Sequence, residues 1–211
     1  MDAVTRQGSC WRCGAETRGA LACAGCQAVQ PVPAELDYFA ALGLPRRLAV
    51  DTADLERRYL DASRALHPDR FQTSTPREQE LSLAASALVN RARRTLRSPV
   101  TRGRYWLELH GMPLGKDNNR VPAALAELVF ETQEALEDFR SGGASRESVA
   151  TTHATLDARL QALVDDLAAR YPAWDAVDPA APSVLDELKT RLSEIAYLDT
   201  LVEDVDEALG V

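Results

Sequence analysis

Residues 51–69 read DTADLERRYLDASRALHPD, and this stretch decides the fold of the chain. Apolar residues recur at helical spacing between Leu55 and Leu66, which predicts an amphipathic helix over residues 51–66. Three basic side chains lie off the apolar face and are expected to face solvent: Arg57, Arg58 and Arg64. Pro68 lacks a backbone N–H and pushes His67 towards extended dihedral angles, so the helix is predicted to end at His67-Pro68-Asp69.

A second amphipathic helix is predicted to begin after a short loop. Thr75 can cap its N-terminus, Pro76 suits the first helical position, and Glu78 completes a capping box. The apolar face of this helix runs from Leu81 to Leu96. Two helices with facing apolar stripes and a short link pack antiparallel, which leaves His67-Pro68-Asp69 exposed at the end of the hairpin.

The composition is that of a globular protein with one domain or two small ones: 211 residues, of which 45% are hydrophobic and 27% charged. No apolar run reaches the roughly 20 residues that span a bilayer. The N-terminus lacks the apolar core of a signal peptide. We therefore expect a cytoplasmic protein.

Charge is distributed unevenly along the chain. Residues 1–35 hold three basic and three acidic residues, whereas residues 36–115 hold 13 basic and nine acidic residues, a net charge of +4. Residues 116–211 hold eight basic and 20 acidic residues, a net charge of −12. This asymmetry favours two surfaces for partners of opposite charge, and an acidic end that only aids solubility is the simpler alternative.

The N-terminal part, residues 1–33, contains all four cysteines of the chain in a C-x2-C-x9-C-x2-C pattern: Cys10, Cys13, Cys23 and Cys26. Two residues between a pair of thiolates let both sulfurs of a tight turn reach one tetrahedral ion. We call residues 1–33 the four-cysteine segment and predict that it binds one structural zinc ion, which supplies much of its folding energy. Iron in the same site and a redox dithiol are the alternatives; the strand–helix context of a catalytic dithiol is not visible here.

The rest of the chain is predicted to be helical. A short helix over residues 37–45 and a further helix over residues 98–111 flank the hairpin. Three longer segments follow at residues 122–139, 145–171 and 183–205, with a break at residues 172–182 and with Ser183 and Asp186 capping the last helix. We expect an all-α fold with three parts: the four-cysteine segment at residues 1–33, the hairpin with its following helix at 36–112, and an antiparallel three-helix bundle at 120–211.

The first bundle helix carries an acidic stripe. Glu127, Glu131, Glu134 and Asp138 fall at helical spacing beside the apolar face, with the bulky Phe130 at the edge. Such a ridge could dock a basic partner through electrostatic steering and one apolar anchor, and a plain solvated helix face is the alternative.

The chain resembles the HscB-type J-domain co-chaperones of iron–sulfur cluster biogenesis over nearly its full length. Matching residues are Asp37-Tyr38-Phe39, Leu42-Gly43-Leu44, His67-Pro68-Asp69-Arg70-Phe71, Ser86, Val89-Asn90, Leu96, Pro99, Arg102, Tyr105, Leu107, Leu109-His110-Gly111 and Tyr197-Leu198-Asp199. The four-cysteine segment is similar to the longer version of this family. The chain departs from the family at Ala126 and Glu127, where large apolar residues are usual.

The resemblance implies two partners. The J-domain of the family docks on a DnaK/HscA-class ATPase chaperone, which by position implies a chaperone-binding set of His67, Pro68, Asp69, Arg57, Arg58, Arg64 and Arg70. The C-terminal bundle of the family holds an IscU-type cluster scaffold protein, and Glu131, Glu134 and Tyr197 match scaffold-binding positions. The neighbouring Glu127 is placed in the same set, and Leu125 or Phe130 is expected to supply the apolar contact.

Other classes of function fit the sequence less well. A J-domain protein for general clients would carry a glycine/phenylalanine-rich linker, which is missing here. A zinc-ribbon nucleic-acid-binding protein would carry a basic four-cysteine segment, whereas this one is neutral. The three histidines, His67, His110 and His153, form no recognisable catalytic set, so no enzymatic activity is expected. Self-association through the four-cysteine segment stays open.

Overall fold

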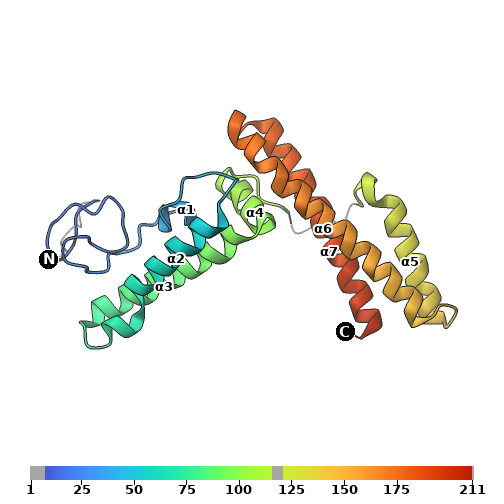
Figure 1. Cartoon of the computed structure of the whole chain (residues 1–211), viewed down its shortest axis with the longest axis horizontal. Helices are drawn as coiled ribbons and strands as arrows, with labels where there is room; N and C mark the ends of the chain where they lie inside the picture. The colour runs from blue at the N-terminus through green and yellow to red at the C-terminus, as the bar shows by residue number, and fades with distance from the viewer. Residues whose placement is uncertain (1–7, 116–120, 211) are drawn as a thin grey trace. The chain divides into compact units, whose positions relative to one another are not determined.

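The computed structural model describes residues 8–115 and 121–210, and it divides into two compact units, residues 1–101 and 102–211. The regular elements of the described residues are all helical (Figure 1). Besides them, the four-cysteine segment has two isolated β-bridges, which join Ser9 to Glu16 and Ala22 to Val29. The prediction of an all-α fold with small turns around the cysteines is confirmed. No described helix is long and apolar enough to cross a membrane.

The first unit is built on the predicted hairpin. Helix α2 (Thr52–Leu66) and helix α3 (Pro76–Arg97) lie side by side in opposite directions, and the 3-10 turn η1 (Pro68–Phe71) follows α2 directly (Figure 1). The capping box of Thr75 and Glu78 is present at the start of α3, as predicted. The buried residues of the two helices include Leu55, Leu66, Ala85, Leu88, Ala92 and Leu96. We call residues 67–71, which follow α2, the tip of the hairpin.

Helix α1 (Tyr38–Ala41) packs against α3 and closes the open side of the hairpin core. Asp37 caps it, and the Phe39 side chain is fully buried. The helix ends early because Gly43 adopts a positive φ of 63°, a conformation that favours glycine. A short helix at this place was predicted.

The second unit contains helices α5 (Ala126–Ser141), α6 (Arg146–Val177) and α7 (Pro182–Leu209), with the 3-10 turn η2 (Ala123–Leu125) before α5. Helices α6 and α7 lie side by side (Figure 1), and α5 contacts both of them. The core-facing residues of α7 are Leu185, Leu188, Leu192, Ile195, Leu198, Leu201 and Val205. On the surface, Arg170 of α6 donates a hydrogen bond to Glu187 of α7 at 2.7 Å.

Two predicted features of this bundle are wrong. The break predicted at residues 172–182 begins too early, because α6 continues through Pro172 to Val177. Tyr171 and Trp174 on either side of Pro172 are both buried, and their packing outweighs the cost of the missing N–H. Ser183 does not cap α7, because the helix begins at Pro182 and its N-cap position is Ala181, with no side-chain cap.

Helix α4 (Pro99–Leu109) contributes Arg102, Gly103 and Trp106 to the core of the second unit. The buried Arg102 guanidinium lies 5.2 Å from the centroid of the Tyr171 ring. Burial lowers the pKa of Arg102, and Tyr171 and Asp175 partly offset this effect. The Trp106 indole N–H donates to the Pro179 carbonyl at 2.8 Å.

Gly103 offers a test of this packing, because a Cβ there would lie 2.5 Å from the Tyr171 hydroxyl oxygen and 3.1 Å from Leu188 Cδ1. Gly103→Ala is therefore expected to lower the free energy of unfolding by about 1–3 kcal/mol, the usual cost of overpacking a core. Urea unfolding followed by circular dichroism measures it. The control is Gly143→Ala, whose Cβ would approach no atom closer than 3.5 Å. Equal stability of the Gly103→Ala variant and wild type would contradict this packing.

Candidate functional site

The tip presents its histidine and aspartate to solvent. His67 ends α2 in an extended conformation, with φ −61° and ψ 131°, as its position before Pro68 requires. Its Nδ1 accepts a hydrogen bond from the backbone N–H of Asp69 at 3.3 Å. The His67 and Asp69 side chains are 53% and 73% exposed, so both are available to a partner.

Two serine hydroxyls from α3 hold the start of the tip. Ser82 and Ser86 donate hydrogen bonds to the Leu66 carbonyl at 2.7 and 2.8 Å. That carbonyl is the last of α2 and would otherwise lack a helical partner. Phe71 is buried at the other end of the tip. Ser82 was not singled out from the sequence; the signal was a second serine four residues before Ser86 on the face of α3 that packs on α2.

The four arginines predicted to lie beside the tip differ in their exposure and in their ion-pair partners. Arg57 and Arg58 both pair with Asp54, and the pKa of that carboxyl is lowered, chiefly by the hydrogen bond from Arg58. Arg64 lies 4.0 Å from Asp61. Arg70, which directly follows Asp69, donates to the Arg64 carbonyl at 3.1 Å. All four stand on α2 and the tip; Arg58 is half-buried, and Arg57 also lies 4.0 Å from a second carboxylate, that of Asp61.

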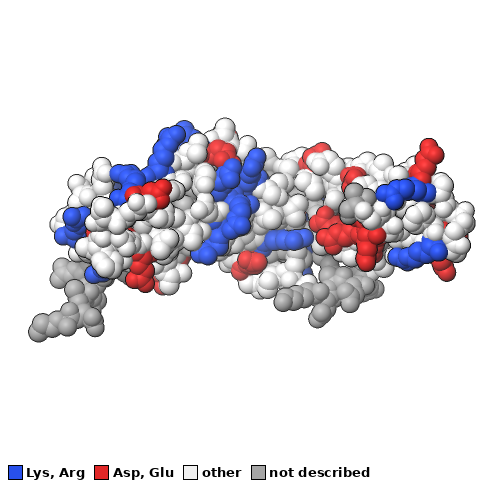
Figure 2. All heavy atoms as spheres, turned by 90° about the horizontal axis from the view of Figure 1, so that it is seen from below, with Lys and Arg blue, Asp and Glu red and all other residues white. Residues whose placement is uncertain are grey.

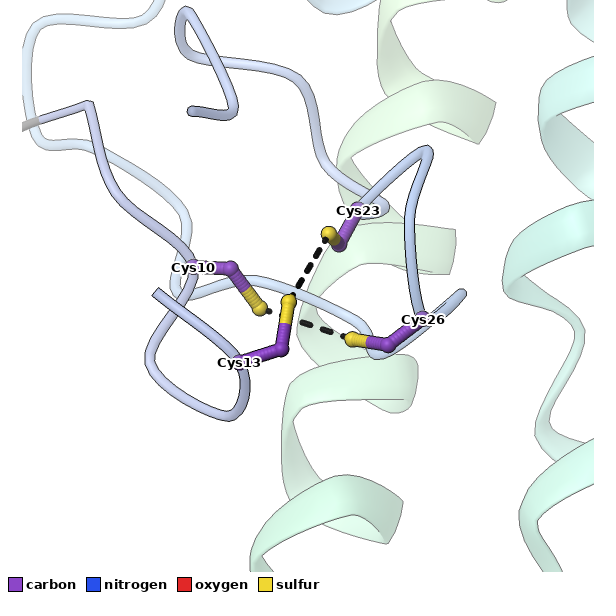
Figure 3. Close-up of side chains that lie close together, drawn as sticks. All are labelled: Cys10, Cys13, Cys23 and Cys26. Atoms are coloured by element: carbon purple, nitrogen blue, oxygen red, sulfur yellow. Dashed lines mark hydrogen bonds between the residues drawn. The ribbon is translucent and has the colours of Figure 1, made fainter. Parts of the chain in front are cut away.

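The four cysteines converge as the spacing predicted, with all their sulfurs within 4.8 Å of one another (Figure 3). Two close pairs join the two turns: Cys10 Sγ lies 3.6 Å from Cys26 Sγ, and Cys13 Sγ lies 3.7 Å from Cys23 Sγ. A tetrahedral ion with metal–sulfur bonds of ~2.3 Å requires sulfurs roughly 3.8 Å apart. The separation is far longer than a disulfide bond of about 2.05 Å, and all four cysteines are free. The arrangement fits a metal ion.

The surroundings of the sulfurs shift the pKa values of Cys10 and Cys26 in opposite directions. Burial raises the pKa of the Cys10 thiol, but backbone N–H groups of Cys13 and Arg12 outweigh it and bring the pKa to about 6. Gln30 also donates to Cys10 Sγ at 3.3 Å, a contact that the sequence did not reveal. At Cys26 the Ala28 N–H lowers the pKa, but burial and the other three sulfurs raise it to about 12. Four thiolates therefore need a cation between them.

The predicted acidic stripe lies on the surface of α5. Glu127, Glu131, Glu134 and Asp138 are exposed, and Phe130 is 70% exposed. Across residues 8–115 and 121–210, none of these carboxylates forms an ion pair. Figure 2 shows a group of acidic side chains on the visible face of the second unit, and many basic ones on that of the first.

The remaining scaffold-binding candidates are less accessible. Tyr197 on α7 is half-buried. Leu125 in η2 is only 1% exposed and fills the core of the second unit, so it has no surface to offer a partner. Between the two apolar candidates, the structure therefore leaves Phe130 as the exposed one.

A helical hairpin with an exposed His-Pro-Asp tip, a four-cysteine metal site and a following three-helix bundle define a J-domain co-chaperone with a metal-binding N-terminus. The chain is 30% identical over 202 residues to the mouse (Mus musculus) iron–sulfur cluster co-chaperone protein HscB. The match covers 93% of this chain and 80% of the mouse protein. The chain belongs to the HscB family.

Solved structures agree with this assignment. The crystal structure of human co-chaperone HscB matches with a TM-score of 0.70 and 26% identity, covering 94% of this chain and 97% of the human one. Chaperone HscB from Vibrio cholerae matches in fold with a TM-score of 0.57 and 24% identity, covering 82% of this chain and 99% of that one. No protein-family model matches the chain.

Proposed function

We propose that this protein is a co-chaperone that stimulates the ATPase of a DnaK/HscA-class chaperone and presents to it an IscU-type iron–sulfur cluster scaffold. The J-domain is the chaperone-docking part and the C-terminal bundle the scaffold-binding part. The observation that carries the proposal is the exposed, hydrogen-bonded His67-Pro68-Asp69 tip in a chain of the HscB family. Such docking accelerates hydrolysis by shifting a conformational equilibrium in the chaperone, so this chain needs no catalytic group of its own.

The chaperone-docking surface consists of the tip together with the basic residues beside it. Arg57, Arg64 and Arg70 are exposed and offer cationic groups to an acidic partner surface. Interfacial charges of this kind act mainly on the association rate and on orientation. Pro68 fixes the backbone, and Asp69 offers a carboxylate for an arginine of the chaperone.

The scaffold-docking surface consists of the acidic stripe of α5 with Phe130. An exposed aromatic ring on the same helix as four exposed carboxylates suits a basic partner with an apolar pocket. Tyr197 is placed in this surface only by family resemblance.

For the four-cysteine site we propose zinc as the resident ion. Four sulfur ligands with pairwise separations of 3.6 and 3.7 Å suit a closed tetrahedral site, which is typical of structural zinc. A nucleic-acid role for the segment is disfavoured, because Arg12 and Arg18 are both engaged in ion pairs, with Glu78 and Glu16.

The proposal is tested by steady-state ATPase measurements on a DnaK/HscA-class chaperone with this protein, with the scaffold, and with both. We expect stimulation by this protein alone and a larger, synergistic stimulation with both. Stimulation without synergy would indicate a J-domain protein for other clients. An ATPase rate that does not respond would refute the proposed function.

Phe130→Ala is expected to weaken scaffold binding by roughly 5- to 30-fold, or about 1–2 kcal/mol, because it removes the one exposed aromatic anchor of the surface. Isothermal titration calorimetry with the scaffold measures the change. The control is Val177→Ala in α6, which truncates another exposed apolar side chain of the same unit, 76% exposed. Equal loss of affinity in both variants would argue against a specific site at Phe130.

The negative charge of the acidic stripe is expected to affect the rate of association with the scaffold. Glu131→Gln with Glu134→Gln is expected to slow association with the scaffold several-fold at low salt and to flatten the dependence of that rate on ionic strength. Stopped-flow association kinetics measure both effects. An unchanged salt dependence would remove these carboxylates from the docking surface.

A further inference from the structure

The four-cysteine segment is held against the J-domain next to the tip, and its contacts there have no assigned role. The first is an ion pair between Arg12 and Glu78, with N–O separation 3.1 Å. Arg12 lies between the first two cysteines, and the Glu78 side chain is only 9% exposed. Glu78 is also the capping-box residue of α3, accepting a hydrogen bond from the Thr75 hydroxyl at 2.9 Å. The ion pair therefore reaches the residue that ends the loop after the tip.

A second contact comes from the same turn of the segment. The Arg77 guanidinium lies 4.6 Å from the centroid of a Trp11 ring, a cation–π geometry. Trp11 is fixed in turn by the second half of the segment, since its indole N–H donates to the Val29 carbonyl at 2.7 Å. Its backbone N–H donates to Gln30 Oε1 at 3.3 Å. The position of Trp11 thus depends on both halves of the segment staying together.

A third contact reaches the tip itself. Gln27 follows Cys26 and has a positive φ of 59°, a backbone conformation imposed by the second turn. Its Oε1 accepts a hydrogen bond from Arg70 at 3.4 Å. Arg70 is the residue after Asp69, and we assigned it above to the chaperone-docking surface.

The contacts thus come from both cysteine pairs and reach both ends of the loop between the tip and α3. Arg12 and Trp11 belong to the first pair and hold the start of α3, whereas Gln27 belongs to the second pair and contacts the tip. The segment has a small core of its own, formed by Cys10, Cys23 and Ala28 with Trp11 and Cys26 beside them. A metal ion would be the main link between the two pairs.

We propose that metal occupancy of the four-cysteine site controls the position of the tip: in the metal-bound segment one cysteine turn holds the start of α3 and the other holds Arg70, and loss of the ion releases both contacts. The metal would then act on chaperone docking from outside the docking surface. The consequence for docking rests on the proposed function, but the coupling of metal to tip does not.

Hydrogen exchange of backbone amides tests this coupling in the full chain without a chaperone. Three amides report on the region: Arg70 bonds to the His67 carbonyl at 3.0 Å, Ser74 to the Phe71 carbonyl at 2.9 Å, and Glu78 to the Thr75 hydroxyl at 3.3 Å. Removing the metal with a chelator is expected to speed exchange at these amides roughly tenfold, while the buried middle of α3 keeps its protection. Unchanged exchange at all three amides after confirmed metal loss would overturn the proposal.

A double variant separates the contacts from the metal. Arg12→Ala with Arg77→Ala removes the ion pair and the cation–π contact without touching a cysteine. With one equivalent of metal still bound, the Ser74 and Glu78 amides of this variant are expected to exchange as fast as in metal-free wild type, because only the Gln27–Arg70 contact is left. The control is Arg18→Ala, which removes an arginine of the same segment that pairs with Glu16, two residues before it. If the double variant lost its metal, the comparison of metal-bound with metal-free wild type would still test the coupling of metal to tip.

The effect on docking is read from the concentration of this protein that gives half-maximal ATPase stimulation. We expect this concentration to rise at least threefold in the metal-free protein and in the double variant, and to stay unchanged in Arg18→Ala. Faster amide exchange at the tip with no change in this concentration would contradict the proposed effect of the metal on docking. Absence of any stimulation by wild type would instead refute the proposed function and leave the exchange result standing.

Discussion

Replacing His67 with glutamine is expected to abolish the stimulation of a DnaK/HscA-class chaperone while leaving the fold intact. The His67 ring is 53% exposed, and its Nδ1 orders the tip by accepting the Asp69 N–H at 3.3 Å. A glutamine side chain is flexible and presents its acceptor differently, so the tip loses its arrangement. Exposed substitutions of this kind change the free energy of unfolding by about 0.5 kcal/mol or less. In contrast, a loss of ~1.4 kcal/mol in the coupling free energy between docking and the conformational change of the chaperone lowers stimulation tenfold.

The His67→Gln measurement needs two readouts. Steady-state ATPase at saturating co-chaperone reports the coupling, and thermal unfolding reports the fold. His153→Gln is the matched control: it makes the same chemical change in α6, where His153 pairs with Asp157 and Asp206. We expect the control to stimulate like wild type. Full stimulation by the His67→Gln variant would remove the tip from the docking mechanism.

The Cys23→Ser variant is expected to lose its metal and the structure of the four-cysteine segment. Cys23 is 1% exposed, and its sulfur lies 3.7 Å from that of Cys13. A serine hydroxyl is a poor zinc ligand, and three remaining thiolates leave the site open. Structural zinc contributes on the order of 10 kcal/mol to the folding of small zinc domains, far more than the few buried residues of this segment supply. The helices have cores of their own and are expected to stay folded.

Metal analysis by mass spectrometry and limited proteolysis measure the outcome for Cys23→Ser. We expect one equivalent of zinc in wild type and much less in the variant, rapid cleavage within residues 8–33, and an unchanged helical signal in circular dichroism. The control is Ala24→Ser, which adds a hydroxyl at the neighbouring exposed position and keeps all four ligands. One equivalent of metal and protease resistance in Cys23→Ser would contradict a four-sulfur site.

Local signals predicted the tip and the metal ligands well. The capping box of Thr75 and Glu78 and the stop at Pro68 depend on neighbouring residues, so sequence was sufficient for them. The cysteine spacing was sufficient for the same reason, because each turn is a local structure. Local signals were insufficient at Pro172, where the buried rings of Tyr171 and Trp174 keep the helix going.

The sequence did not predict which apolar side chains are buried or which distant residues form hydrogen bonds with each other. Leu125 and Phe130 have similar apolar character and lie near each other in the chain, yet one is 1% exposed and the other 70% exposed. Which of them faces out depends on how η2 and α5 pack in the bundle. Likewise, the bonds from Ser82 and Ser86 to Leu66 join residues 16 and 20 positions apart.

The sequence by itself determined the all-α fold, the exposed His67-Pro68-Asp69 tip, the metal ligands and the acidic face of α5. Each of these follows from residue type at short spacing, where helix periodicity, capping and turn chemistry act directly. Only the tertiary structure decided that Arg12 pairs with Glu78 and that Gln27 contacts Arg70. Those pairs are 66 and 43 residues apart, and they meet because the four-cysteine segment packs against the hairpin beside its tip.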